Sequence, residues 1–407
     1  MTPQETANRT DLRLPSSPAA AQRDSTRAWL AATGGFMALF VAFGLAYSYG
    51  QFFVAMAADF GAPSTAGGTV FSVTSLVFFC LGVGSGPLAD RVGPRLLLGA
   101  ATVLIASGLI ATSYTQELWQ AYLAYGIGIG LGVGCVYVPI VTATGRWFER
   151  RRSLATGFVV SGIGLGTVIV PPVSAWLVES YGWPTAYRCY AVAICAVLLL
   201  ATALMANPPP SREPGSRNAA DRRRRRRRFL LFYTSALLTN IGLYVPFVYL
   251  SPAARDLGVE AVTAAALVST IGLASVFGRI ALGALADRVS TLVLYRACSI
   301  VIALSFWIWG AASNYAVLLV FSIVLGLGYG GYIALTSVVL SQQFGLTDLG
   351  RLLGLTYTAV GIGSAAGPAL LGALLSTTGS YTPGLLLLAL LALAGAVAIS
   401  LFRDRAT

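Results

Sequence analysis

The sequence predicts an all-α membrane protein with twelve transmembrane helices arranged as two related bundles of six. Of its 407 residues, 56% are hydrophobic and 10% charged, and the mean hydropathy is +0.75. A soluble protein of this length needs far more charge to cover its surface. Runs of about 20 apolar residues recur, each long enough to cross a bilayer as a helix. The runs lack the alternation of an outer-membrane barrel.

The apolar runs set the expected helices, with ends uncertain by a few residues. We expect them at 28–57, 67–89, 94–114, 117–145, 152–178, 184–206, 229–254, 261–286, 291–312, 315–342, 350–376 and 381–402. Residues 1–27 are polar and predict a disordered cytoplasmic N-terminus. The first run is too long for the core of a signal peptide, so we expect it to be retained.

Charge sets the expected orientation. The net charge of +12 comes from Arg alone, since the sequence contains neither Lys nor His. Nearly all of the arginines fall in alternate loops, which places both termini in the cytoplasm of a multi-pass protein of the plasma (inner) membrane. Because the basic residues follow this topology, they do not indicate a nucleic-acid partner.

The stretch "NPPPSREPGSRNAADRRRRRRR", 207–228, divides the helices into two groups, 28–206 and 229–402. Its prolines, polar residues and like charges predict a disordered cytoplasmic linker. We expect its seven consecutive arginines, 222–228, to contact anionic lipid headgroups. Residues 403–407 are expected to form a short cytoplasmic tail.

The two groups are tandem copies. "PLADRVG" at 87–93 recurs as "ALADRVS" at 284–290, an offset of 197 residues. At the same offset Gly157 corresponds to Gly354, and Pro171 to Pro368. Copies in the same orientation imply a pseudo-twofold axis along the membrane normal, and transporters built in this way bind substrate near the midplane between the halves.

The segment "GPLADRVGPR", 86–95, resembles the loop motif of the major facilitator superfamily. Two glycines would allow a tight turn and close helix contact, and the aspartate could cap a helix or pair with an arginine. We predict a conformational latch that breaks as the halves move; the alternative is a simple topological anchor. Its expected members are Gly86, Asp90, Arg91, Gly93 and Arg95, with Asp287 and Arg288 from the second copy.

A second signature resembles a narrower family. "RWFERRRSLATGFVVSGIGLG" at 146–166, "AYSYG" at 46–50 and "GLYVPFVYLSPAARDLG" at 242–258 are similar to segments of monocarboxylate transporters and their oxalate:formate exchanger relatives. The resemblance implies the major facilitator fold and transport of carboxylates. It specifies the family well and the substrate poorly.

Arg279 stands alone in its apolar run, between Glu260 and Asp287. All fifteen acidic residues fall in tails, loops or near predicted helix ends. A guanidinium at such depth is costly, so its side chain either reaches the cytoplasmic interface or binds an anion from solution through paired N–H donors. The resemblance implies the second, because monocarboxylate transporters carry their anion-binding arginine at this place.

Deep polar side chains could supply further substrate contacts. The candidates are Tyr47, Tyr137, Asn240, Tyr329, Tyr332 and Tyr357. Each tyrosine could equally be a packing residue, and Asn240 could bond to a neighbouring helix instead.

Three positions depart from the family pattern. Gln51 and Ser275 stand where animal members carry a Lys and an Asp, so the usual proton relay is missing, and they join the candidate site. Val360 stands where the oxalate exchanger has a second cation. With one central cation, a monocarboxylate is favoured over a dianion, and the proton would travel with the substrate.

The expected function is secondary active transport of lactate- or pyruvate-like monocarboxylates by alternating access, with proton coupling. The alternatives are anion exchange, drug:proton antiport and a sensor that binds ligand without transport. Without His, Lys or a deep carboxylate, acid–base catalysis has almost no candidate residue, so we expect neither an enzyme nor a cofactor. The five cysteines are expected to pack in the apolar runs without binding a metal.

Overall fold

The computed structural model describes residues 23–61, 66–208, 219–346 and 348–402. Within these ranges the chain is helical, and eleven stretches are long and apolar enough to cross a membrane. The chain is therefore an all-α, multi-pass membrane protein, as predicted. Of the expected N-terminal and C-terminal tails, residues 1–22 and 403–407 lie outside the described residues.

The N-terminal bundle holds six helical segments. Five are continuous: α2 (Thr26–Asp59), α3 (Ala66–Val92), α4 (Pro94–Thr112), α8 (Arg152–Tyr181) and α9 (Trp183–Leu204). The fourth segment is broken into α5 (Leu118–Ala121), the π-helix η1 (Tyr122–Ile129), α6 (Gly130–Gly134) and α7 (Tyr137–Trp147). Its glycines face α3 and α4: a β-carbon on Gly130 would lie 2.9 Å from Val77, and one on Gly132 would lie 2.4 Å from Ile105. Small residues thus let these helices pack closely.

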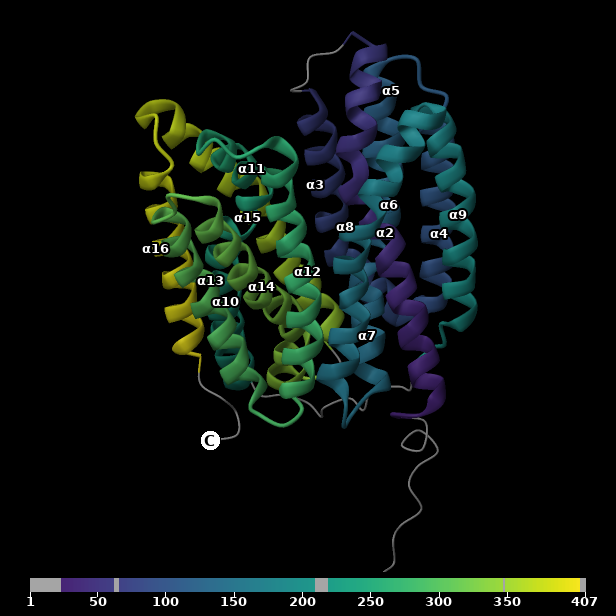
Figure 1. Ribbon diagram of the computed structural model, residues 1–407. Coiled ribbons are helices and arrows are strands. Elements are labelled where there is room, and N and C mark those ends of the chain that lie inside the picture. Colours follow the sequence, from purple (N-terminus) through teal and green to yellow (C-terminus); the bar gives the residue numbers. More distant parts are fainter. Residues whose placement is uncertain (1–22, 62–65, 209–218, 347, 403–407) are drawn as a thin grey trace, which may run out of the picture.

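The C-terminal bundle repeats this pattern. Its members are α10 (Ala219–Leu243) with α11 (Pro246–Asp256), α12 (Ala261–Leu285), α13 (Thr291–Gly310), α14 (Tyr315–Phe344), α15 (Leu349–Thr378) and α16 (Thr382–Ser400). The break between α10 and α11 precedes Pro246, whose ring cannot continue the hydrogen-bond ladder of the preceding turn. Figure 1 shows the two groups side by side, with α2–α9 in purple to teal and α10–α16 in green to yellow.

Of the expected linker at 207–228, residues 209–218 lie outside the described residues, and the part from Ala219 onward is helical, because α10 begins there. Arginine is a good helix former, and partners more than a hundred residues away hold this turn. Arg225 donates to the Asp348 carboxylate at 2.5 Å and to the Phe344 carbonyl at 2.7 Å. Arg228 donates to Gln343. At least these two arginines therefore bind the protein itself, where lipid headgroups were expected.

The ends of the helices are unequal in charge. The loops between α3 and α4, α7 and α8, α12 and α13, and α14 and α15 lie at one end of the molecule, together with the starts of α2 and α10. We call this the arginine-rich end. It is the lower end in Figure 1, where the C-terminus is marked.

Glycines bring the two bundles into backbone contact in the half nearer the arginine-rich end. A β-carbon on Gly86 of α3 would lie 2.5 Å from the Gly350 carbonyl oxygen of α15. A β-carbon on Gly283 of α12 would lie 2.8 Å from the Ser153 carbonyl oxygen of α8. The two contacts occupy equivalent positions of the 197-residue repeat. A third glycine contact between the bundles lies further from this end, at Gly272, where a β-carbon would be 3.2 Å from Val168.

Candidate functional site

Arg279 is buried in the middle of the molecule, 1% exposed, on the face of α12 that meets α8. Two glycines of α8 leave the space that the backbone and side chain of Arg279 occupy. A β-carbon on Gly157 would lie 2.3 Å from the Arg279 carbonyl oxygen, and one on Gly164 would lie 2.7 Å from its Nη1. The side chain is therefore directed into the interface between the bundles and does not reach the surface of the arginine-rich end.

The guanidinium has a sparse set of partners. Its Nη1 donates to the Val160 carbonyl of α8 at 3.2 Å. The Tyr329 ring lies 5.5 Å from its central carbon, and the Tyr329 hydroxyl also interacts with the guanidinium. Its Nε is buried and has no hydrogen-bond partner among the described residues. No ion pair joins Arg279 to an acid of the described chain; the pairs found there involve Arg23, Arg146 and Arg225.

Tyrosines from both bundles surround this cation. Tyr47 on α2, Tyr137 on α7 and Tyr329 on α14 all lie within electrostatic range of the guanidinium. Tyr357 on α15 meets Tyr137 across the interface, with the ring centroids 4.5 Å apart and the ring planes tilted by 46°. Of the five predicted tyrosines, four thus gather around Arg279, and they offer hydroxyls in an otherwise aromatic and apolar setting.

A fifth tyrosine, Tyr244, belongs to the same cluster and was not singled out from the sequence. It interacts with Tyr329, Tyr47 and Tyr137, and it lies at the break between α10 and α11. The signal was present in the sequence, because Pro246 two residues later marks a helix interruption. Interrupted helices line binding sites in many transporters.

Tyr332 and Asn240 lie in a different polar cluster, inside the C-terminal bundle. The Tyr332 ring stacks on Tyr295 at 4.8 Å. Its hydroxyl lies near Tyr295, Thr239 and Asn240 but has no hydrogen-bond partner among the described residues. The Asn240 amide donates to the Ala236 carbonyl of its own helix at 2.7 Å. Both are predicted substrate contacts, and the structure places both inside the C-terminal bundle, in a cluster separate from that of Arg279. Sequence gives the depth of a polar residue but not the face it occupies.

Ser275 is buried one turn before Arg279, and its hydroxyl donates to the Gly272 carbonyl at 2.7 Å. It is therefore engaged by its own helix. Gln51 lies within α2, but its side chain is outside the described part of the structure. Val360 is buried on α15 and brings no charge.

The two expected latch aspartates behave differently. Asp287 of the C-terminal bundle accepts hydrogen bonds from the backbone N–H groups of Ser153 and Leu154, at 3.1 and 3.2 Å, at the start of α8. Asp90 pairs with Arg146 at 2.6 Å inside the N-terminal bundle. Of these two aspartates, the one in the second copy of the motif therefore makes a contact that spans the bundles.

The remaining members of the motif fall into two groups. Arg91, Arg95 and Arg288 are exposed at the arginine-rich end. Gly86 provides the backbone contact to Gly350 described above. Gly93 has a φ of +87°, and a β-carbon there would lie 2.6 Å from Asn207. Position 93 thus favours glycine for the turn itself.

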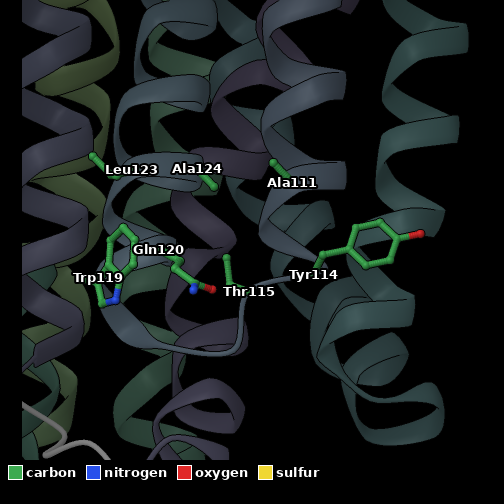
Figure 2. Close-up of a pocket in the computed structure, with 7 residues that line it drawn as sticks. All are labelled: Ala111, Tyr114, Thr115, Trp119, Gln120, Leu123 and Ala124. Carbon is green, nitrogen blue, oxygen red and sulfur yellow. The ribbon is translucent and has the colours of Figure 1, made fainter.

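A surface pocket of about 390 Å³ lies in the N-terminal bundle, between the end of α4 and the start of the fourth segment. Figure 2 shows Tyr114 and Trp119 on its two sides. Both residues are more than half exposed, and the Arg188 guanidinium lies 4.7 Å from the centre of the Tyr114 ring. Exposed aromatic rings near helix ends are typical of the membrane interface. This pocket is separate from Arg279, which lies on α12 of the other bundle.

The comparisons with known proteins agree with this architecture. The Major Facilitator Superfamily matches residues 35–310 and 294–407. Monocarboxylate transporter 13 of Bos taurus is 30% identical, over 90% of this chain and 87% of the relative. The aspyridones efflux protein of Emericella nidulans is 27% identical, over 87% of this chain and 73% of the relative.

Two solved structures share the fold. The human organic anion transporter MFSD10 superimposes with a TM-score of 0.73 and 15% identity, over 91% of this chain and 99% of the other. The proton:xylose symporter XylE superimposes with a TM-score of 0.71 and 13% identity, over 92% and 95%. At these identities the likeness concerns the fold alone.

Proposed function

Because the chain belongs to the major facilitator superfamily, and is a secondary transporter with monocarboxylate transporters among its relatives, we propose that it carries small monocarboxylate anions. Lactate- and pyruvate-like acids are the expected substrates. The two bundles would expose the site around Arg279 to one side of the membrane at a time.

One observation carries this proposal: the buried guanidinium of Arg279 has an unpaired Nε and no acidic partner in the described chain. Removing a charge from water without a counter-charge costs several kcal/mol, so the site is poised for an anion that arrives from solution. A carboxylate matches the planar fork of donors that a guanidinium presents.

The number of charges at the site argues for one carboxylate per substrate. The acids of the described chain lie in loops or close to helix ends, including Asp59, Asp90 and Asp256. Val360 stands where the oxalate exchanger carries its second cation. A dianion at this site would keep one charge uncompensated in a setting of low polarity, which is unfavourable.

The same scarcity of titratable groups supports a simple mode of coupling. With no His or Lys in the sequence, the proton would travel with the substrate carboxylate, so that the pair crosses as a neutral acid. The alternative is exchange of one carboxylate for another. Proteoliposomes distinguish the two: an inward proton gradient drives accumulation in a symporter, whereas an exchanger needs preloaded anion.

The arginine-rich end is proposed to face the cytoplasm of the plasma (inner) membrane, which follows the positive-inside rule. The bundles meet through Gly86 and Gly283 in the half nearer this end. The structure then corresponds to a state closed toward the cytoplasm. In this state Asp287 caps α8 across the interface, and we propose that this cap is the latch that must break before the site opens inward.

A second candidate is efflux of a larger organic anion. It is favoured by the relatedness to fungal efflux proteins and by the aromatic rings of Tyr137, Tyr329 and Tyr357 around the cation. Such a substrate would use the same guanidinium, so the two candidates differ in the size of the acid and in the direction of transport. Drug:proton antiport of cations lacks the deep acid it would need.

The test is uptake by proteoliposomes of radiolabelled lactate, pyruvate, benzoate and succinate, with and without a pH gradient. Arg279→Gln keeps a polar side chain but removes the charge, and we expect it to abolish uptake while the protein still folds and inserts. Normal uptake by Arg279→Gln would refute the assignment. Thermal stabilisation by these acids without any flux would instead indicate a ligand sensor.

A further inference from the structure

Residues of both bundles form the proposed anion site, and a group of the N-terminal bundle holds the guanidinium of the C-terminal bundle in place. Arg279 belongs to α12 of the C-terminal bundle, whereas the carbonyl that holds its Nη1 belongs to Val160 on α8 of the N-terminal bundle. Gly164, one turn further along α8, leaves the space that Nη1 occupies. Two elements of α8 therefore act on the guanidinium: Gly164 leaves space for it, and the Val160 carbonyl orients it.

The anchor leaves one edge of the guanidinium available. A helical carbonyl accepts one hydrogen bond in the helix ladder and has a second lone pair, which here takes the Nη1 donor. The Nε donor remains buried and unpaired in the described chain, and the adjacent Nη2 lies on the same edge of the planar group. Two parallel donors on one edge match the two oxygens of a carboxylate.

We propose that Gly164 and the Val160 carbonyl are positioning elements of the anion site, and that tight anion binding requires α8 and α12 to be in contact. This inference rests on the proposed function, and it adds a role for residues that the substrate does not touch. The anchor fixes the plane of the guanidinium. The Nε edge then meets an incoming carboxylate without loss of further side-chain freedom.

The arrangement links affinity to conformation. When the bundles part at the arginine-rich end, α12 moves away from α8 and the Nη1 anchor is lost. The anion is then held less tightly on the side to which it is released. By linkage, a bound anion favours the closed contact to the same extent. A coupling of about five-fold is at the lower end of what such contacts produce.

The sharpest test adds one carbon to α8. A β-carbon at Gly164 would lie 2.7 Å from Nη1 and 2.6 Å from Val276 Cγ2. Gly164→Ala alone changes both contacts and could fail to fold. In the Val276→Ala background the valine contact is removed, so the double variant Gly164→Ala/Val276→Ala isolates the contact with the guanidinium. Val276→Ala alone is the reference.

Gly272→Ala is the matched control. It lies on the same pair of helices, and its β-carbon would meet Val168 at 3.2 Å, away from the guanidinium. Uptake of radiolabelled pyruvate and benzoate gives KM and Vmax for each variant, after thermal melting of the purified proteins has established that they are folded.

We expect the double variant to raise KM at least about five-fold over Val276→Ala with Vmax changed less than two-fold, and Gly272→Ala to leave KM unchanged. An unchanged KM, or a fall in Vmax alone, would overturn the proposal, because Gly164 would then serve packing only. If the unmodified protein transports none of the acids, it is the carboxylate function that fails. Uptake by the unmodified protein and by Val276→Ala thus distinguishes failure of the proposed carboxylate transport from failure of the proposed positioning role of Gly164.

A separate variant tests whether tight anion binding depends on contact between α8 and α12. Gly283→Val widens the α8–α12 contact at the Ser153 carbonyl, which lies 2.8 Å from the β-carbon position. We expect its KM to rise as well. Spin-label distances report whether the bundles of this variant have separated. If they have separated and KM still equals that of the unmodified protein, tight anion binding does not require contact between α8 and α12.

Discussion

The carbonyl oxygen of Arg279 lies 2.3 Å from the position that a β-carbon on Gly157 would occupy. In the repeat this pair corresponds to Gly82 and Gly354, where a β-carbon on Gly354 would lie 2.2 Å from the Gly82 carbonyl oxygen. Arg279 thus stands at the repeat position of an interface glycine. The two bundles therefore meet backbone to backbone at two symmetry-related places. At one of these places the C-terminal bundle carries Arg279 in place of a glycine.

This relationship predicts that Gly157→Ala weakens the closed contact between α8 and α12. The added methyl group cannot be accommodated against a main-chain oxygen, and overpacking of this kind costs about 1–3 kcal/mol. Spin labels at the exposed positions Leu96 and Val293, in a protein freed of its native cysteines, report the distance between the bundles. We expect a longer mean distance.

Gly84→Ala is the control for this experiment, because a β-carbon there has no neighbour within 4 Å. It should leave the distance distribution unchanged. Identical distributions for Gly157→Ala and the unmodified protein would show that the contact is not tight in the membrane.

A second prediction concerns the two aspartates of the repeated motif. Asp287→Asn removes the charge that caps the start of α8 from the opposite bundle, an interaction of about 0.3–1 kcal/mol, or up to ~2 kcal/mol when partly buried. The same spin-label pair should therefore report more of the open form. Asp90→Asn breaks the pair with Arg146 inside one bundle and should alter the distance less. The reverse order would place the latch at Asp90.

The helices themselves were predictable, because length and apolar content are local properties of the sequence. The expected helix at 94–114 is α4, Pro94–Thr112, and the expected helix at 152–178 is α8, Arg152–Tyr181. The isolation of Arg279 could also be anticipated, since the positions of all acids along the chain are visible in the sequence.

The sequence does not show which residues that are distant along the chain contact each other in the fold. The arginine run was assigned to a linker because its composition is typical of one, whereas Asp348 and Phe344, which hold Arg225, lie over a hundred residues away. The Val160 carbonyl has no signature at all, because every residue carries a backbone carbonyl. Tyr332 and Asn240 are buried, as their positions in apolar runs predict, but they lie in a cluster separate from that of Arg279.

The start of α10 offers a third prediction. Arg225→Ala removes bonds to Asp348 and to the Phe344 carbonyl, and we expect the protein to lose about 1 kcal/mol of stability. Arg226 is exposed in the same turn, so Arg226→Ala should change the melting temperature in detergent very little. Equal melting temperatures for the two variants would mean that the contacts of Arg225 add nothing to stability.

The aromatic surroundings of Arg279 yield a last prediction, about selectivity. Benzoate and cyclohexanecarboxylate carry the same charge and the same number of carbons, but only benzoate has a ring that can stack. An aromatic pair contributes about 0.5–1.5 kcal/mol beyond its buried area. Facing Tyr137 and Tyr357, benzoate should therefore show a KM roughly 2- to 10-fold lower than that of cyclohexanecarboxylate.

The preference should depend on those rings. Tyr137→Leu keeps a large apolar side chain but removes the ring that lies 4.5 Å from the Tyr357 ring, and we expect it to bring the two KM values together. Liposomes with Arg279→Gln correct for neutral acid that crosses the bilayer unaided. If cyclohexanecarboxylate is carried as well as benzoate by the unmodified protein, the rings pack against each other rather than against the substrate. The carboxylate would then be the part of the acid that the site recognises.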